Sequence, residues 1–123
     1  MKFASLPLLV IPLLLCVAKP LAAHEILARR ETANLSAADR SAAASAEYEA
    51  LERDEIVYGF LWHGSDGAEG FLSVSGEFPS VYGMGGCRRL MHIIRHPGDG
   101  GVNPTFDGTV CRSWDGKWSV KER

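Results

Sequence analysis

The pattern of apolar and polar positions divides the chain into three parts. Residues 3–17 are almost uniformly apolar, residues 24–55 are rich in Ala and charged residues without any Gly or Pro, and the later part holds all 13 glycines. A breaker-free segment followed by short apolar runs between glycine turns is the sequential pattern of an α+β domain. We therefore expect an N-terminal helix packed on an antiparallel β-meander of about five strands.

A capping signal marks the start of the helix. Ser36 is a favourable N-cap residue, Asp39 lies three positions later, and Leu35 is placed to form the outer half of a hydrophobic staple. These residues predict a helix that begins near Ala37.

Small apolar residues then recur with helical spacing, which predicts a helix lying close against a sheet. This stripe consists of Ala38, Ala42, Ala46, Ala50 and Leu51. The flanking charged residues are Arg40, Glu47, Glu49 and Glu52. We expect them on a solvated face, with a partner-binding face as the alternative.

The first two predicted strands cover residues 57–62 and 70–78. Gly67 lies in the glycine-containing turn between them, so these strands should form a hairpin.

Cys87 and Cys111 predict the register of a second hairpin. If they face each other across an antiparallel pair, every pair of facing residues sums to 198 and the midpoint is Asp99. That residue lies inside Pro-Gly-Asp-Gly-Gly, the strongest turn signal in the chain. Two separate features therefore predict that residues 87–95 pair with residues 105–114.

A last turn at Asp115-Gly116 has the composition of a two-residue type I′ hairpin and predicts a final strand over residues 117–120. Large residues are needed opposite the Ala-rich helix. The core candidates are Trp62, Phe71, Phe78, Phe106 and Trp118.

The apolar leader is typical of a secretory signal. Lys2 precedes it, the run is shorter than a membrane span, and small residues end at Ala23. We expect residues 1–23 to be a signal peptide, with His24 as the mature N-terminus. The alternative is a lipoprotein in which Cys16 becomes the first residue.

Cleavage after Ala23 changes the cysteine count from three to an even pair. In an exported protein, Cys87 and Cys111 are then expected to form one disulfide. Closing a loop of about 25 residues contributes about 3.5 kcal/mol in the chain-entropy model. The expected organisation is the signal at 1–23, a helical segment at 24–55 and the stapled sheet at 56–123, the last two forming one domain.

Composition and charge narrow the function classes. The chain has 46% hydrophobic and 23% charged residues and a formal charge of −2. This composition fits one ordinary domain and excludes a chain that is disordered over most of its length. Residues 24–56 carry four basic side chains against eight acidic ones. This acidic balance argues against a nucleic-acid partner.

Two arginines are the candidate binding residues. Arg88 and Arg112 each follow a cysteine and share the sheet face opposite the disulfide in the predicted register, where they could bind an anion. The alternative is that they pair internally with Glu77, Asp107 or Asp115 and cover the sheet with their stems.

Catalytic and metal-binding signals are weak. His92 and His96 are about 13 Å apart along a strand, too far to share a metal. His63, Ser65 and Asp66 are triad residue types, but neighbours on one turn rarely converge. We expect no metal site, no cofactor and no enzyme activity, and rank a small hydrolase last.

The order Cys87-Arg88, Gly108-Thr-Val-Cys111-Arg112 and Asp115-Gly-Lys-Trp118 resembles the C-terminal domain of the bacterial outer-membrane surface antigen family, typified by the rickettsial 17-kDa antigen. The similarity extends to the segment around Leu35 and covers nearly the whole mature chain.

This resemblance implies an exported cell-envelope protein with a non-catalytic binding or structural role, in the periplasm or at the outer membrane or surface of a Gram-negative bacterium. Its partner would be an envelope component or a protein, and nothing in the mature sequence predicts membrane association. The alternative function is a periplasmic inhibitor or accessory factor of an envelope enzyme or secretion complex, acting through a loop such as 97–104.

Overall fold

The computed structural model describes residues 24–76, 86–98 and 103–122. The predicted signal peptide with Cys16, and also Glu77, Phe78 and Asp99, lie outside these residues. The elements are α1 (Ala37–Leu51), β1 (Val57–His63), β2 (Glu69–Ser75), β3 (Cys87–Arg95), β4 (Thr105–Arg112) and β5 (Trp118–Glu122).

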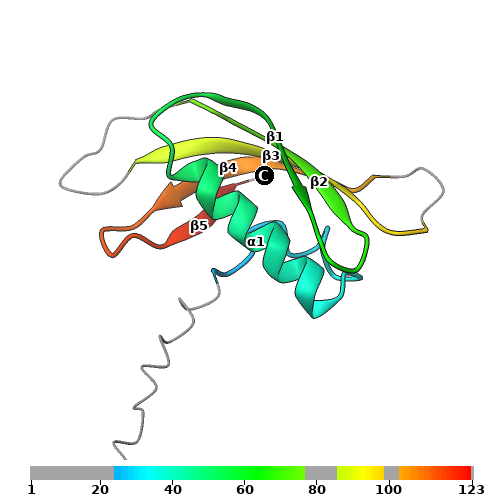
Figure 1. Cartoon of the computed structure of the whole chain (residues 1–123). Coiled ribbons are helices and arrows are strands. Elements are labelled where there is room, and N and C mark those ends of the chain that lie inside the picture. The colour runs from blue at the N-terminus through cyan, green and yellow to red at the C-terminus, as the bar shows by residue number, and fades with distance from the viewer. Residues whose placement is uncertain (1–23, 77–85, 99–102, 123) are drawn as a thin grey trace, which may run out of the picture.

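The five strands form one antiparallel sheet in the order β1-β2-β3-β4-β5, so the predicted α+β meander is confirmed. Figure 1 shows α1 lying across one face of the curved sheet, with the segment before it beneath the helix. No helix in the described ranges is long and apolar enough to cross a membrane.

The start of α1 agrees with the capping signal. The Ser36 side chain accepts the Asp39 backbone N–H at 3.1 Å, and the helix begins at Ala37. The buried face differs from the predicted stripe, because Ala38 is exposed while Asp39 and Glu47 are buried. These two acids can be buried because their oxygens have partners: backbone N–H groups of the segment before the helix and of the β1–β2 turn, and His92 on β3. The buried helix residues are Asp39, Ala43, Ala44, Ala46, Glu47, Ala50 and Leu51.

The cysteine hairpin has the predicted register. Cys87 faces Cys111, Ile93 faces Thr105, and every intervening pair sums to 198. The two cysteines form a disulfide with a Cα–Cα distance of 4.0 Å. The predicted staple between β3 and β4 is therefore present.

The last turn differs from the predicted type I′ hairpin. The Gly116 N–H donates to the Ser113 carbonyl, and the Ser113 N–H donates to the Lys117 carbonyl, both at 2.9 Å. Gly116 has a φ of 87°. This is a three-residue loop with a glycine bulge, in which the left-handed conformation falls on Gly116 alone. β5 therefore begins at Trp118, one residue later than predicted.

The aromatic core is confirmed for Trp62, Phe106 and Trp118, all of which are buried. The prediction for Phe71 is wrong, since its side chain is 38% exposed. Alternation along β2 explains this, because the neighbouring Leu72 points into the core and so directs Phe71 to the outer face. β2 also ends at Ser75, before the predicted limit.

Candidate functional site

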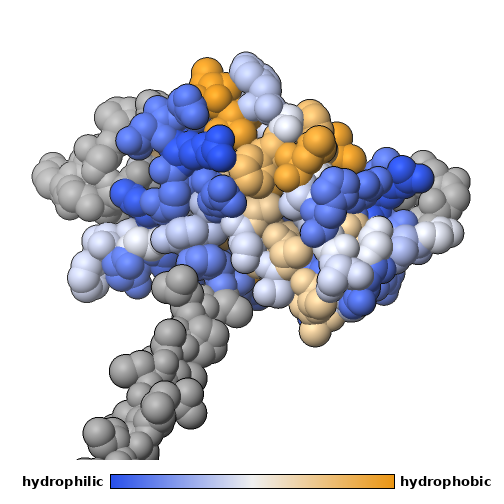
Figure 2. Space-filling model, in the orientation of Figure 1, coloured by the Kyte–Doolittle hydropathy of each residue, from blue (hydrophilic) through white to orange (hydrophobic). Residues whose placement is uncertain are grey.

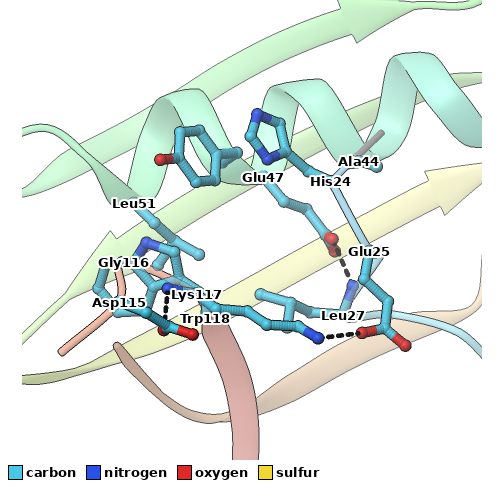
Figure 3. Close-up of a pocket in the computed structure, with 11 residues that line it drawn as sticks. His24, Glu25, Leu27, Ala44, Glu47, Leu51, Asp115, Gly116, Lys117 and Trp118 are labelled. Atoms are coloured by element: carbon cyan, nitrogen blue, oxygen red, sulfur yellow. Dashed lines mark hydrogen bonds and ion pairs between the residues drawn. The ribbon is translucent and has the colours of Figure 1, made fainter. Parts of the chain in front are cut away.

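A groove of about 680 Å³ lies between α1, the segment at residues 24–27 and the β4–β5 turn. Figure 3 shows these three walls and the side chains that meet there. The lining residues are His24, Glu25, Leu27, Ala44, Glu47, Tyr48, Leu51, Asp115, Gly116, Lys117 and Trp118. Its size lies within the range of small-ligand sites.

Glu47 holds the first wall in place. The N-terminal strap, defined here as residues 24–35, donates two backbone N–H groups to this side chain. The Leu27 N–H binds Oε1 at 2.7 Å and the Ala28 N–H binds Oε2 at 3.2 Å. One buried carboxylate on α1 therefore fixes the strap to the helix.

A buried relay continues from Glu47 into the sheet. His92 Nδ1 lies 2.9 Å from Glu47 Oε2, and the Trp62 indole N–H donates to His92 Nε2 at 2.7 Å. An indole N–H can only donate, so His92 Nε2 must be an acceptor and the ring carries its proton on Nδ1, which donates to Glu47. The described contacts thereby satisfy both ring nitrogens and leave neither open to the groove.

The opposite wall is organised by Glu52, just beyond the end of α1. Its Oε1 accepts the Trp118 indole N–H at 2.9 Å, and its Oε2 pairs with Arg112 Nη1 at 2.9 Å. The Arg112 guanidinium also lies 6.0 Å from the centroid of the Trp118 ring. The indole that closes the groove is thus held at its N–H and contacted by a cation.

The rim carries the more accessible polar groups. The His24 ring stacks on Tyr48 with centroids 3.6 Å apart, and Lys117 Nζ lies 3.6 Å from Glu25 Oε2. The Ser113 hydroxyl, and next the Lys117 backbone N–H, donate to Asp115 and lower the pKa of its carboxyl. Asp115 is therefore a stable anion at the mouth of an otherwise largely apolar groove.

Arg88 occupies a different place from the groove. Its buried guanidinium donates to the carbonyls of Leu51, Arg53 and Glu55 at 3.2, 2.5 and 2.5 Å, and to Gly76 at 3.4 Å. The carbonyls at the end of a helix lack partners within the helix. Arg88 therefore binds the end of α1 and the following loop to the sheet.

The two predicted anion-binding arginines lie on the helix side of the sheet, but each has its own protein acceptors. Arg88 binds carbonyls, and Arg112 binds Glu52. The structure does not bring them to one open site, and anion binding stays a prediction. The alternative partners also differ, because Asp107 pairs with Arg89 at 2.9 Å and Asp115 binds its own turn.

The triad residue types do not converge. His63 Nδ1 pairs with Glu69 at 3.4 Å. The Asp66 N–H donates to Asp39, which also accepts from Ala68 and so anchors the β1–β2 turn to the helix.

In the described ranges, no three His, Cys, Asp or Glu side chains are grouped in a way that could hold a metal ion.

Sequence reasoning missed the relay of Glu47, His92 and Trp62. The available signal was the alternation in β3, because His92 has the same parity as the buried Leu90 and Ile94. A buried histidine needs a partner, and that requirement predicts an inward-facing acid on the covering helix.

Comparison with family models, curated proteins and solved structures found no match.

Proposed function

We propose that this chain is an exported cell-envelope protein of the surface antigen type, with a non-catalytic binding role centred on the groove. The leader and the order of Cys-Arg and Asp-Gly-x-Trp motifs support the location and the type. The groove supports the binding role.

The observation that carries the proposal is the way in which the groove is built. Its walls come from three segments far apart in the sequence, and side-chain hydrogen bonds from Glu47 and Glu52 hold two of them. A site held in its binding geometry loses less conformational freedom when a ligand enters. Such preorganisation favours recognition.

The groove chemistry indicates the class of ligand. Glu47 has hydrogen-bond donors of its own at the base, while Leu27, Leu51 and Tyr48 provide apolar surface. Charge is accessible at the rim, on Lys117 and Asp115. The best-fitting ligand therefore has an apolar group that enters the groove and polar groups that remain at its mouth.

Filling the groove tests this role. Ala44 lines it, whereas the neighbouring Ser45 is exposed on the same helix and does not. Ala44→Trp should lower retention of the purified protein on isolated cell envelopes at least tenfold, which corresponds to a loss of about 1.4 kcal/mol in binding free energy. Ser45→Trp should leave retention unchanged.

Lys117→Glu is a second groove variant, and it should also lower retention on the envelopes. Lys117 is 65% exposed at the rim, so its replacement does not alter the core. Circular dichroism would confirm that each variant is folded. Equal retention of wild-type protein and both groove variants would contradict the proposal.

Export is tested separately by the intact mass of the protein from its native cell. Cleavage after Ala23 with one disulfide gives the mass of residues 24–123 minus two hydrogens. A mass that begins at Cys16 and includes a lipid would instead establish the lipoprotein form.

An inhibitor or accessory factor is the second candidate, favoured by Trp114. This side chain is 83% exposed at the tip of the β4–β5 turn, where Ser113 and Asp115 side chains reinforce the loop. Exposed indoles on rigid turns are typical anchors at protein interfaces. Trp114→Ala should then weaken retention on a protein partner while Ala44→Trp leaves it unchanged.

A further inference from the structure

His92 is a titratable group at the centre of the fold. It is fully buried, and the Glu47 side chain beside it is 1% exposed. Figure 2 shows that side chains fill the space between α1 and the sheet on the side in view. The charge of a histidine ordinarily changes between about pH 5 and about pH 8. A histidine in this position can therefore make the fold respond to pH.

A second proton on His92 has only one place to bind. Nδ1 already carries a proton and donates it to Glu47, so the added proton must bind Nε2. Nε2 lies 2.7 Å from the Trp62 indole nitrogen, which is itself a donor. Two N–H groups cannot face each other at that distance. Protonation therefore removes the Trp62 hydrogen bond and makes the two rings move apart.

Trp62 is held on the side of β2. It faces Gly70 across the β1–β2 pair, and a side chain at Gly70 would collide with the indole ring. The indole thus occupies the space that Gly70 leaves free and lies against the β2 backbone. A protonated His92 therefore has to move relative to Trp62, and its contact with Glu47 changes at the same time.

Glu47 is the charged group that the described contacts place on His92. The residues that face His92 from the neighbouring strands β2 and β4 are Leu72 and Phe106, and neither can ionise. The other two charged side chains buried in the described part of the chain bind backbone groups elsewhere. They are Asp39 on α1 and Arg88 on β3. A change in the charge of His92 is therefore felt first by Glu47.

His92 and the strap share one oxygen of Glu47. Oε2 accepts the Ala28 N–H at 3.2 Å and the proton on His92 Nδ1 at 2.9 Å, while the Leu27 N–H binds Oε1. Figure 3 shows the Glu47 carboxylate turned toward the strap at Leu27. Hydrogen bonds from a charged donor are shorter and stronger than those from a neutral donor. A positively charged His92 that moves away from Trp62 therefore draws Oε2 away from Ala28.

Other contacts of the strap are less sensitive to this change. Nε2 of His96 donates to the Glu31 carbonyl at 3.1 Å, and Lys117 Nζ pairs with Glu25. A ring nitrogen that faces a carbonyl donates in both protonation states, so added acid leaves the His96 contact in place. The remaining charged or titratable side chains of the strap are His24, Arg29 and Arg30. The contact with Glu47 is therefore the one that protonation of His92 weakens.

We propose that protonation of His92 loosens the N-terminal strap, so that acid changes one wall of the groove. In the neutral state the relay is complete, and Glu47 holds the Leu27 and Ala28 N–H groups. In the protonated state the bond to Trp62 is lost and Glu47 turns from the strap toward the imidazolium. An effect on ligand binding rests on the proposed function of the groove, whereas the loosening of the strap does not.

NMR of the purified protein between about pH 8 and about pH 5 tests this response. The His92 ring nitrogens should report protonation, and the Trp62 indole N–H resonance should shift with the same midpoint. After correction for the intrinsic effect of pH on exchange, the protection of the Leu27 and Ala28 amides should fall at least tenfold. The Leu90 amide in the central strand β3 should stay protected, which separates local loosening from global unfolding.

His92→Asn removes the titrating ring and keeps a donor near the position of Nδ1. The strap of this variant should be protected to the same degree at both pH values. His63→Asn is the matched control, since His63 is 72% exposed and lies outside the relay, and it should respond to acid as the wild type does. Loosening that persists in His92→Asn would assign it to His24 or His96 and overturn the inference.

The wild-type protein alone also decides the question, even where His92→Asn does not fold. A strap that stays protected while His92 becomes protonated would overturn the inference, as would a strap that loosens while His92 stays neutral. Loss of Leu90 protection at the same pH would equally overturn it. Because the strap itself is measured, failure of the Ala44→Trp test would contradict the binding role of the groove and leave this result standing.

Discussion

Trp62 donates its indole N–H to Nε2 of His92 at 2.7 Å, across the two strands that flank β2. The contact fixes the histidine tautomer, and through Nδ1 it extends to Glu47 on the helix. A single chain of hydrogen bonds thus joins the sheet, α1 and the N-terminal strap.

This relay makes the stability sensitive to small changes in its members. Glu47→Gln should lower the free energy of unfolding by about 2–4 kcal/mol, because an amide NH₂ replaces an acceptor oxygen in a site that supplies three donors. Trp62→Phe should cost about 1–3 kcal/mol by leaving Nε2 of the buried His92 without its donor. Urea unfolding measures both values.

Glu49→Gln is the control, since Glu49 lies on the same helix but its side chain is 63% exposed. Its effect should stay within about 0.5 kcal/mol. Equal losses for Glu47→Gln and Glu49→Gln would show that the relay adds no stability of its own.

Arg88 is expected to stabilise the end of α1. Arg88→Ala should lower the free energy of unfolding by about 2–4 kcal/mol, because several carbonyls lose a charged donor in a buried position. Lys cannot reproduce the planar fork, so Arg88→Lys should recover only part of the loss. The neighbouring Arg89 points outward to Asp107, and Arg89→Ala should cost at most about 1 kcal/mol.

The disulfide should contribute much of the stability. Cys87→Ser combined with Cys111→Ser is expected to lower the free energy of unfolding by about 2–4 kcal/mol, because the unfolded chain regains the freedom of the closed loop. Thermal unfolding of this variant and of the reduced wild-type protein should give the same lower midpoint. An unchanged midpoint would mean that the sheet does not depend on the link.

Asp115 should give the β4–β5 turn a pH dependence. Its folded pKa is lowered, mainly by the Ser113 hydroxyl, so its contribution is present above the unfolded pKa and is lost as pH falls through the folded pKa. Ser113→Ala should raise the Asp115 pKa toward its ordinary value, measured by NMR titration of the carboxyl carbon. No change in that pKa would exclude the hydroxyl as the main cause.

Local signals were sufficient to predict much of the fold. Ser36 and Asp39 marked the helix start, and Cys87, Cys111 and the turn around Asp99 gave the β3–β4 register. The helix start depends on residues that are close together in sequence. The β3–β4 register depends on one turn and one covalent link. The β4–β5 loop was less predictable, because the same Asp-Gly pair suits a two-residue or a three-residue turn.

The site depended on long-range contacts that local patterns do not encode. An acid on an Ala-rich helix normally faces solvent, so Glu47 was assigned to the wrong face. Its burial follows from His92 and from the Leu27 N–H, which are 45 and 20 positions away. Arg112 likewise pairs with Glu52, which is 60 positions away in sequence, instead of with a neighbouring acid.

Glu47 forms the base of the groove and also tethers the strap that makes one of its walls. The shape of the mouth and the persistence of the folded state consequently depend on the same carboxylate. A substitution at position 47 would change both at once, whereas the Lys117 side chain at the rim is 65% exposed and can be replaced without altering the core. If the groove has the proposed binding role, changes in specificity should therefore accumulate around the opening and spare its base.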